Sequence, residues 1–169
     1  MQFLFSLLDE VTAGAIQAWR YEGAYATYNM GSDDGDKAVE GMAELLDRRS
    51  PYYAVRDEQG ELMGFFTVGT SALIEESNEP GIYLEDRTIA IGLGMRPDAM
   101  GKGMGLAFVQ ACLDFARQEF APEHFQLYVF SWNKRAIRVY ERAGFQHAGI
   151  VLQHNMHGDH EFLEMSRDA

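Results

Sequence analysis

The hydrophobic pattern of the first half of the chain predicts a strand, two helices and a hairpin. Apolar residues recur three and four positions apart where a helix is expected, and at every second position where a strand is expected. The turn sequence Asp57-Glu58-Gln59-Gly60 separates two apolar runs and predicts an antiparallel hairpin. The predicted elements are a strand at residues 3–7, a helix at 9–19, a Gly- and Asp-rich loop at 31–36, a helix at 37–49, strands at 52–56 and 61–68, and a loop at 69–81.

Residues 87–95 alternate between large and small side chains, which predicts a strand with two unlike faces. Pro97 ends this strand. Interior glycines weaken a strand, so two of them on one face indicate that something passes close to the backbone there. The large face carries Ile89, Ile91, Leu93 and Met95, and the small face carries Thr88, Ala90, Gly92 and Gly94.

The second half continues with alternating helices and strands. A glycine-rich turn at residues 100–105 leads into a helix whose apolar stripe predicts burial on one side. Asn133 is placed to cap a short helix that Gly144 stops. This order predicts an α/β fold whose sheet is mixed but mostly antiparallel. The remaining predicted elements are a strand at 125–130, a helix at 133–142, and a closing strand pair at 145–152 and 161–166.

Composition is consistent with one domain spanning residues 1–169, because 47% of the residues are hydrophobic and 24% are charged. The net charge of -12 argues against a nucleic-acid partner, since phosphate backbones would be repelled, but it suits a cationic partner such as an amine. Cys112 is the single cysteine, which excludes an intrachain disulfide and suits a reducing compartment. The apolar N-terminus is short and followed by acids, so we expect no signal peptide, no membrane partner and a cytoplasmic location.

The turn Met100-Gly101-Lys102-Gly103-Met104-Gly105 precedes a helix and predicts an anion site. Backbone N–H groups at a helix start are unsatisfied, and glycine allows phosphate oxygens to approach them. The spacing fits neither a nucleoside-triphosphate loop nor a dinucleotide fingerprint. A tight strand-to-helix turn that needs glycine only for its geometry is the alternative.

A second motif occurs one strand later. Asn133, Ala136, Ile137 and Tyr140 share one helix face, and Gly144-Phe145 follows. With Arg96-Pro97 and the glycine-rich turn, this motif makes residues 88–145 resemble the GNAT superfamily of N-acetyltransferases. The two motifs stand in the order and at the separation of that family.

The resemblance implies that acetyl-CoA lies where the strands 87–95 and 125–130 splay apart. The glycine-rich turn would hold the pyrophosphate, and Asn133 would bond the pantetheine arm. Met100 departs from the family, which usually has Gln or Arg there, so we expect somewhat weaker coenzyme binding. No metal is implied. The coenzyme-binding residues implied are Leu93, Gly94, Met95, Met100, Gly101, Lys102, Gly103, Met104, Gly105, Asn133, Ala136 and Tyr140.

The implied reaction is direct attack of an amine on the thioester, with an oxyanion held by a strand amide, that of Leu93. Tyr140 would protonate the departing sulfur; a core tyrosine is the alternative reading of this residue. The strand offers no carboxylate as general base, because Ala90 and Gly92 occupy the relevant positions. Glu85 is the base candidate, beside Asp86, and a solvated surface acid is the alternative for each.

The acceptor pocket is expected from the first third of the chain, where the aromatic residues Trp19, Tyr21, Tyr25 and Tyr28 gather. Aromatic faces near Asp33, Asp34 or Asp36 would suit an ammonium group, and simple packing against the sheet is the alternative. We expect a small-molecule amine as acceptor. A peptide amine, at a protein N-terminus or lysine, and a non-catalytic acyl-CoA sensor remain the other hypotheses.

Two other patterns are read as structural. His154, His157 and His160 fall in an expected hairpin tip, where a spacing of three does not place them on one face, so we predict no metal site. Cys112 has no histidine spaced to activate it and is expected to be a small buried residue.

Overall fold

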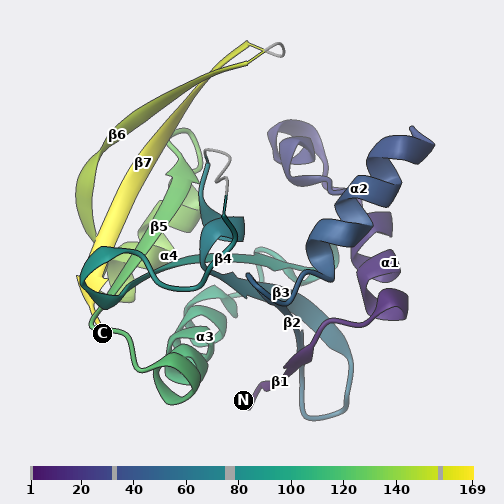
Figure 1. The fold of residues 1–169 in the computed structure, drawn as a ribbon, viewed down its shortest axis with the longest axis horizontal. Coiled ribbons are helices and arrows are strands. Elements are labelled where there is room, and N and C mark those ends of the chain that lie inside the picture. Colours follow the sequence, from purple (N-terminus) through teal and green to yellow (C-terminus); the bar gives the residue numbers. More distant parts are fainter. Residues whose placement is uncertain (1, 32–33, 75–78, 156–157) are drawn as a thin grey trace.

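The computed structural model describes residues 2–31, 34–74, 79–155 and 158–169. Within these residues, seven strands form one sheet in the order β1-β2-β3-β4-β5-β7-β6 (Figure 1). Neighbouring strands run antiparallel except for β4 and β5, which are parallel. The strands are β1 (Leu4–Leu7), β2 (Tyr52–Arg56), β3 (Leu62–Val68), β4 (Thr88–Met95), β5 (His124–Phe130), β6 (Gln146–Asn155) and β7 (Gly158–Asp168).

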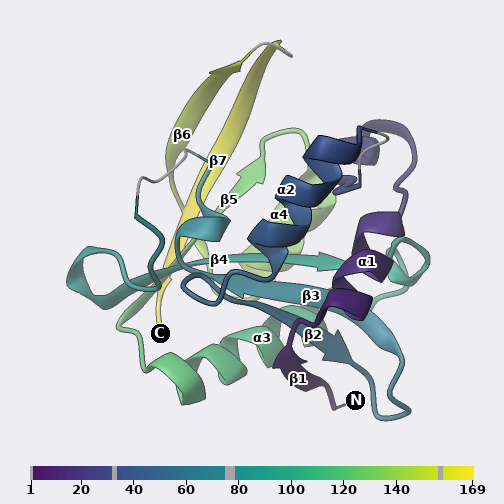
Figure 2. The same cartoon turned by 45° about the vertical axis from the view of Figure 1, so that its right-hand side comes forward.

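Helices cover both faces of the sheet (Figures 1 and 2). One core, built around Phe66, Phe108 and Phe125, packs the helices α3 and α4 against the sheet. A smaller core, which contains Ile16 and Leu45, packs α1 and α2 against the other face. The helices are α1 (Glu10–Ala18), α2 (Gly35–Leu45), α3 (Gly105–Phe120) and α4 (Lys134–Arg142), with short 3-10 helices η1 (Gly23–Tyr28), η2 (Thr70–Ala72), η3 (Glu85–Arg87) and η4 (Pro97–Ala99).

The mixed, mostly antiparallel α/β fold is confirmed, and most element boundaries agree within two residues. Helix α2 differs most at its end, since it stops at Leu45, four residues before the predicted end. It also begins two residues early, inside the predicted loop, because Oδ1 of Asp34 accepts hydrogen bonds from the amides of Asp36 and Lys37 and thereby caps it. The 3-10 helix η1 lies where the pattern predicts no element. It buries no residue, so it leaves no hydrophobic periodicity to detect.

The parallel strands β4 and β5 pair only at their beginnings. Thr88, Ile89 and Ala90 face His124, Phe125 and Gln126, and no later residues of the two strands pair. From Ile91 onward β4 pairs with β3 alone, whereas β5 continues along β7 to Phe130. The sheet therefore opens between β4 and β5.

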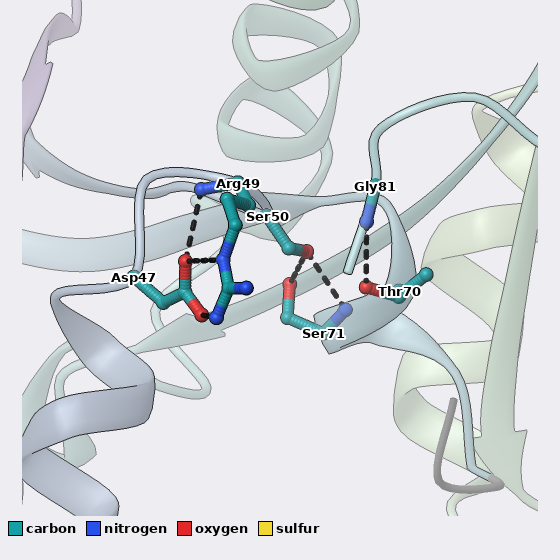
Figure 3. Close-up of polar contacts among 6 residues, drawn as sticks. All are labelled: Asp47, Arg49, Ser50, Thr70, Ser71 and Gly81. Carbon is teal, nitrogen blue, oxygen red and sulfur yellow. Dashed lines mark hydrogen bonds and ion pairs between the residues drawn. The ribbon is translucent and has the colours of Figure 1, made fainter. Parts of the chain in front are cut away.

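The loop between β3 and β4 is tied to the start of β2 by hydroxyl groups (Figure 3). The Ser71 amide donates to the hydroxyl of Ser50 over 2.8 Å, and the two hydroxyl oxygens lie 2.7 Å apart. The Gly81 amide donates to Oγ1 of Thr70 over 3.2 Å, which closes the loop. These bonds hold Ala72 against the β4 residue Gly92.

Across the described part of the chain, no helix combines the length and apolar character needed to cross a bilayer.

Candidate active site

A cavity of about 520 Å³ occupies the opening between β4 and β5. The residues after Ala90 on β4 and after Gln126 on β5 form two of its walls. The start of α3 and one face of α4 form a third wall, and residues between α1 and α2 complete the lining. The segments that carry the two sequence motifs thus meet the predicted aromatic segment around one space.

The backbone of β4 directs polar groups into this opening. Ala90 bonds to Gly69 and Arg96 bonds to Met63, so the even-numbered residues between them also face β3. The amide and carbonyl of Leu93 therefore point toward the gap. The carbonyl of Met95 does so as well, and it accepts a hydrogen bond from the hydroxyl of Tyr21 over 2.6 Å.

The small face of β4 is covered by side chains of this same chain. A Cβ on Gly94 would lie 2.5 Å from the ring of Phe65, its neighbour on β3, and a Cβ on Gly92 would lie 3.1 Å from Thr67. The two glycines predict that another group lies close to the backbone here. Phe65 and Thr67 occupy at least part of that space. Phe65, Gly92 and Gly94 still border the cavity.

The glycine-rich turn presents unsatisfied amides. Gly101 and Gly103 have φ angles of +73° and +80°, which only glycine adopts at low cost. Among the described residues, no carbonyl or side chain accepts from the amides of residues 101–104, and Met104 provides no side-chain cap for α3. The first helical acceptor in use is the Met104 carbonyl, bonded by Phe108 over 3.0 Å. Such a row of free N–H groups at a helix start suits a phosphate.

The side chains of the turn differ in their positions. Met100, Gly101, Gly103 and Gly105 border the cavity, whereas Lys102 is exposed and Met104 packs into the core beside α3. Lys102 and Met104 therefore contribute no side chain to the described lining of the cavity.

Arg135, which the sequence analysis does not select, supplies a cation at the turn. Nη1 of Arg135 lies 3.3 Å from the position of a Cβ built on Gly101, and its guanidinium lies 4.7 Å from the centre of the Tyr25 ring. No carboxylate of the described residues lies within 4.0 Å of this guanidinium. The sequence feature that could have identified Arg135 is its position two residues after Asn133, on the turn of α4 nearest the cavity.

Asn133 has two partners in the structure. Its Oδ1 accepts from the Ala136 amide over 3.2 Å, which confirms the predicted cap of α4. Its Nδ2 donates to the hydroxyl of Tyr28 over 2.9 Å. Asn133 and Ala136 both line the cavity, so the predicted coenzyme contact of Asn133 lies beside the predicted acceptor residue Tyr28.

Tyr140 lines the cavity from α4 and is partly buried, with its ring edge-on to Phe145. No described residue forms a hydrogen bond with its hydroxyl. Loss of hydration raises the pKa of Tyr140 well above its usual value, and the neighbouring Tyr28 and Cys112 add to this. The phenol therefore keeps its proton throughout the neutral range, as a general acid must.

Three of the four predicted acceptor aromatics border the cavity. Tyr21, Tyr25 and Tyr28 lie in its wall, whereas Trp19 packs among the small core beside α1 and α2. Burial raises the pKa of Tyr21 to about 12 and also raises that of Tyr28, although the bond from Asn133 partly offsets the latter. The sequence analysis missed three aromatic residues beside them, Phe130, Trp132 and Phe162. Phe130 stacks with both Trp132 and Phe162 and contacts Tyr28, and Trp132 contacts Tyr25.

The predicted acids lie elsewhere. Glu85 is exposed in η3, before the paired start of β4, at the end away from the opening. Asp34 caps α2, Asp36 is exposed in its first turn, and Asp33 lies outside the described residues. The described residues that line the cavity include no carboxylate.

The histidines and the cysteine form no second site in the described part of the chain, where no three metal-ligating side chains gather. His154 pairs with Asp159 over 2.6 Å, His160 lies against the ring of Phe130, and His157 is outside the described residues. Cys112 is fully buried, and loss of hydration raises the pKa of its thiol well above the usual value, which opposes reactivity.

Two known proteins with similar sequences are named as acetyltransferases. The chain is 38% identical over 91 residues to a mycothiol acetyltransferase of Propionibacterium freudenreichii, which covers 53% of the chain and 26% of that protein. It is 33% identical over 118 residues to a streptothricin acetyltransferase of Streptomyces lavendulae, covering 70% of the chain and 56% of that protein. The matches thus span about a quarter to a half of these relatives.

A solved structure, the spermidine N-acetyltransferase from Vibrio cholerae in complex with CoA and spermine, superposes with a TM-score of 0.75 at 17% identity. The superposition covers 99% of this chain and 95% of that one, which shows a shared fold. The sequence model of the acetyltransferase (GNAT) family matches residues 13–145, most of the chain and both motifs. The chain therefore belongs to the acetyltransferase (GNAT) family.

Proposed function

We propose that this protein transfers the acetyl group of acetyl-CoA to the amine of a small molecule. The observation that carries the proposal is the row of free amides at the start of α3, which opens onto a cavity between the parted strands β4 and β5. A phenol that keeps its proton, Tyr140, borders the same cavity.

Coenzyme binding is assigned to the turn and to the free edge of β4. The amides of residues 101–104 suit a pyrophosphate, and Arg135 beside Gly101 supplies the positive charge that Met100 lacks. The gap-facing backbone of Leu93 suits an extended amide-bearing arm. Asn133 would contact that arm in exchange for, or in addition to, its bond to Tyr28.

The coenzyme supplies a reactive thioester. Tyr140 is assigned the proton that the departing sulfur needs, because its pKa is raised by burial and its hydroxyl has no described partner. The Leu93 amide, directed into the gap, is assigned the carbonyl oxygen. Glu85 receives no role, since it is exposed and lies at the paired end of β4.

A small acceptor with an aromatic or apolar body suits the remaining wall. The aromatic residues Tyr25, Tyr28, Phe130 and Phe162 border the cavity, and its described lining contains no carboxylate. The similar proteins are named for mycothiol, streptothricin and spermidine, so their names agree on acetyl transfer and differ in acceptor. A peptide amine and a sensor without turnover are the competing functions.

Thiol release from acetyl-CoA in the presence of an amine panel tests the proposal. The panel contains phenethylamine, phenylalaninamide, spermidine and a peptide with a free N-terminus. We expect turnover with at least one aromatic amine and saturable binding of CoA by calorimetry. Binding of CoA without thiol release for any amine would favour the sensor, and absence of binding would overturn the proposal. Turnover of the peptide alone would favour the second function.

A further inference from the structure

A carboxylate, Glu164, lies behind the cavity wall and is hydrogen-bonded to a phenol that forms part of that wall. Tyr128 on β5 stands opposite Glu164 on β7, and its hydroxyl donates to Oε1 of Glu164 over 3.0 Å. The side-chain amide of Gln126 donates to the same oxygen over 2.9 Å. It also donates to the Tyr128 hydroxyl oxygen. Three side chains therefore hold the phenol and the carboxylate in fixed contact.

Tyr128 stands where the acceptor amine is expected. It comes two residues after Gln126, the last β5 residue that pairs with β4, so it lies on the part of β5 that borders the opening. Tyr128 lines the cavity together with the aromatic residues Phe130 and Phe162. The described lining of that cavity contains no carboxylate that could accept the proton of the ammonium directly.

Glu164 has a separate connection to solvent. It is only partly buried and borders a second hollow of about 580 Å³, which Gln126 also lines and Tyr128 does not. A proton that reaches Glu164 from the cavity side therefore has a way out on the other side. The Tyr128–Glu164 pair connects the two spaces.

Resting on the proposed function, we propose that Tyr128 and Glu164 form the proton relay that converts the bound ammonium into the attacking amine. An N–H bond of the ammonium breaks and its proton binds the Tyr128 oxygen, while the phenol proton moves to Oε1 of Glu164. The products are a neutral amine, a neutral phenol and a protonated carboxyl, which loses its proton to water in the second hollow. Tyr128 is the catalytic residue and Glu164 the positioning residue that acts through it.

The relay supplies a proton acceptor for the ammonium, which the described lining of the cavity does not offer as a carboxylate. An amine with a pKa of about 10 is neutral in only about one molecule per thousand at pH 7, so a proton acceptor is required. Amines with a pKa of about 8 need it much less. The advantage of the relay must therefore shrink as the solution pH rises, or as the pKa of the acceptor falls.

Other titratable groups near the pair must be separated from it in a pH profile. The ion pair of His124 and Asp168, 3.0 Å long, borders the second hollow with Arg167. His160 lies against Phe130, and Tyr140 borders the cavity. His124→Gln and His160→Gln are therefore included as controls.

The experiment measures kcat/KM from about pH 6 to about pH 10 for Tyr128→Phe, Glu164→Gln and the unchanged protein, with phenethylamine and phenylalaninamide as probes. If neither is accepted, the fastest amine of the panel replaces them. For phenethylamine at neutral pH we expect a loss of about 100-fold for Tyr128→Phe and about 10-fold for Glu164→Gln. Both losses should fall below about threefold near pH 10, and both should be smaller with phenylalaninamide.

Binding of CoA by calorimetry supplies a readout besides activity and should be unchanged in both variants. Tyr83→Phe is the matched control, because that exposed phenol bonds the Phe120 carbonyl away from the cavity. A loss by the same factor at every pH would mean a structural role, and a rise confined to the amine KM would mean an ammonium anchor; either overturns the relay. Full activity in both variants would overturn the relay and leave the proposed function standing, whereas loss of CoA binding in the unchanged protein would overturn both.

Discussion

The two halves of the cavity are built from different parts of the chain. The half assigned to the coenzyme consists mainly of backbone: the amides of residues 101–104 and the gap-facing groups of β4. The half assigned to the acceptor consists of side chains from η1, β5 and β7, with Tyr28, Phe130 and Phe162 among them. Backbone geometry is fixed by a few glycines and a helix start, whereas a side-chain wall changes with every substitution.

Such a division would allow proteins of similar sequence to be named for unlike acceptors. A coenzyme that stays the same can be bound by a fixed backbone arrangement, and acceptors that vary can be bound by a wall of side chains. Residues that contradict this division are the most informative to change. Tyr140 and Arg135 are side chains in the half assigned to the coenzyme, and Tyr21, in the half assigned to the acceptor, bonds the backbone of β4.

Tyr140→Phe should give the largest effect. Phenylalanine lacks the hydroxyl group that is the proposed acid, so kcat should fall about 100- to 1000-fold. The affinity for CoA should stay within about twofold, because the ring that packs against Phe145 is retained. Thiol-release kinetics and calorimetry measure the two quantities, with Tyr83→Phe as the control. Equal weakening of kcat and CoA binding would show that Tyr140 holds the coenzyme and is not the acid.

Alanine at Gly101 or Gly103 should give the next largest effect, on coenzyme affinity. Both positions have φ near +75°, where a Cβ costs about 1–2 kcal/mol, so the turn should relax and aim its amides away from the ligand. The dissociation constant of CoA should rise about 10- to 30-fold, which calorimetry measures. Gly14→Ala is the control, since it lies within α1 with open space around its Cβ position and should stabilise the fold slightly. Unchanged affinity in both turn variants would contradict a backbone-built site.

The same division decides what could be predicted from sequence. The glycine-rich turn, the cap at Asn133 and the order of strands are local features, and each leaves a pattern within a few residues. The opening of the sheet, in contrast, is predicted only by the family resemblance. The pairing of β4 with β5 shows that it begins after Ala90.

The acceptor wall could not be assembled from sequence in the same way. Phe162 and Phe130 meet because β5 and β7 are neighbours, although 31 other residues separate them along the chain. Proximity in sequence places Trp19 with Tyr21, yet Trp19 ends α1 and packs against the small core. Glu164 gave no signal, since an acid in an alternating strand resembles any solvated residue.

Arg135→Gln should give a smaller effect, again on the affinity for CoA. Loss of the cation beside Gly101 should raise the dissociation constant of CoA about 10-fold, because a charge-assisted contact to phosphate is worth about 1.5 kcal/mol. The difference from the unchanged protein should shrink at high salt. Arg138→Gln on the exposed side of α4 is the matched control. Equal affinity at low salt would leave the turn amides as the whole phosphate site.

Tyr21→Phe should give the smallest effect and tests the link between the two halves. Its hydroxyl donates to the Met95 carbonyl over 2.6 Å, so the variant should lose about 0.5–1.5 kcal/mol of stability near neutral pH. Burial raises the pKa of Tyr21 to about 12, above the unfolded value of 10. The unfolded state therefore loses this proton first, and the contribution to stability is complete below pH 10 and declines as the pH rises toward 12.

Tyr21→Phe should accordingly be less sensitive to alkali than the unchanged protein, although it is less stable at neutral pH. Melting temperatures between about pH 8 and about pH 11 measure the difference in slope. Tyr25→Phe is the matched control, because it removes a hydroxyl from the same segment without the bond to Met95. If both variants lose stability in parallel with the unchanged protein as pH rises, the Tyr21 hydroxyl does not titrate with folding. The acceptor segment would then be held by ring contacts such as that between Tyr21 and Tyr28, and the two halves would be joined by packing alone.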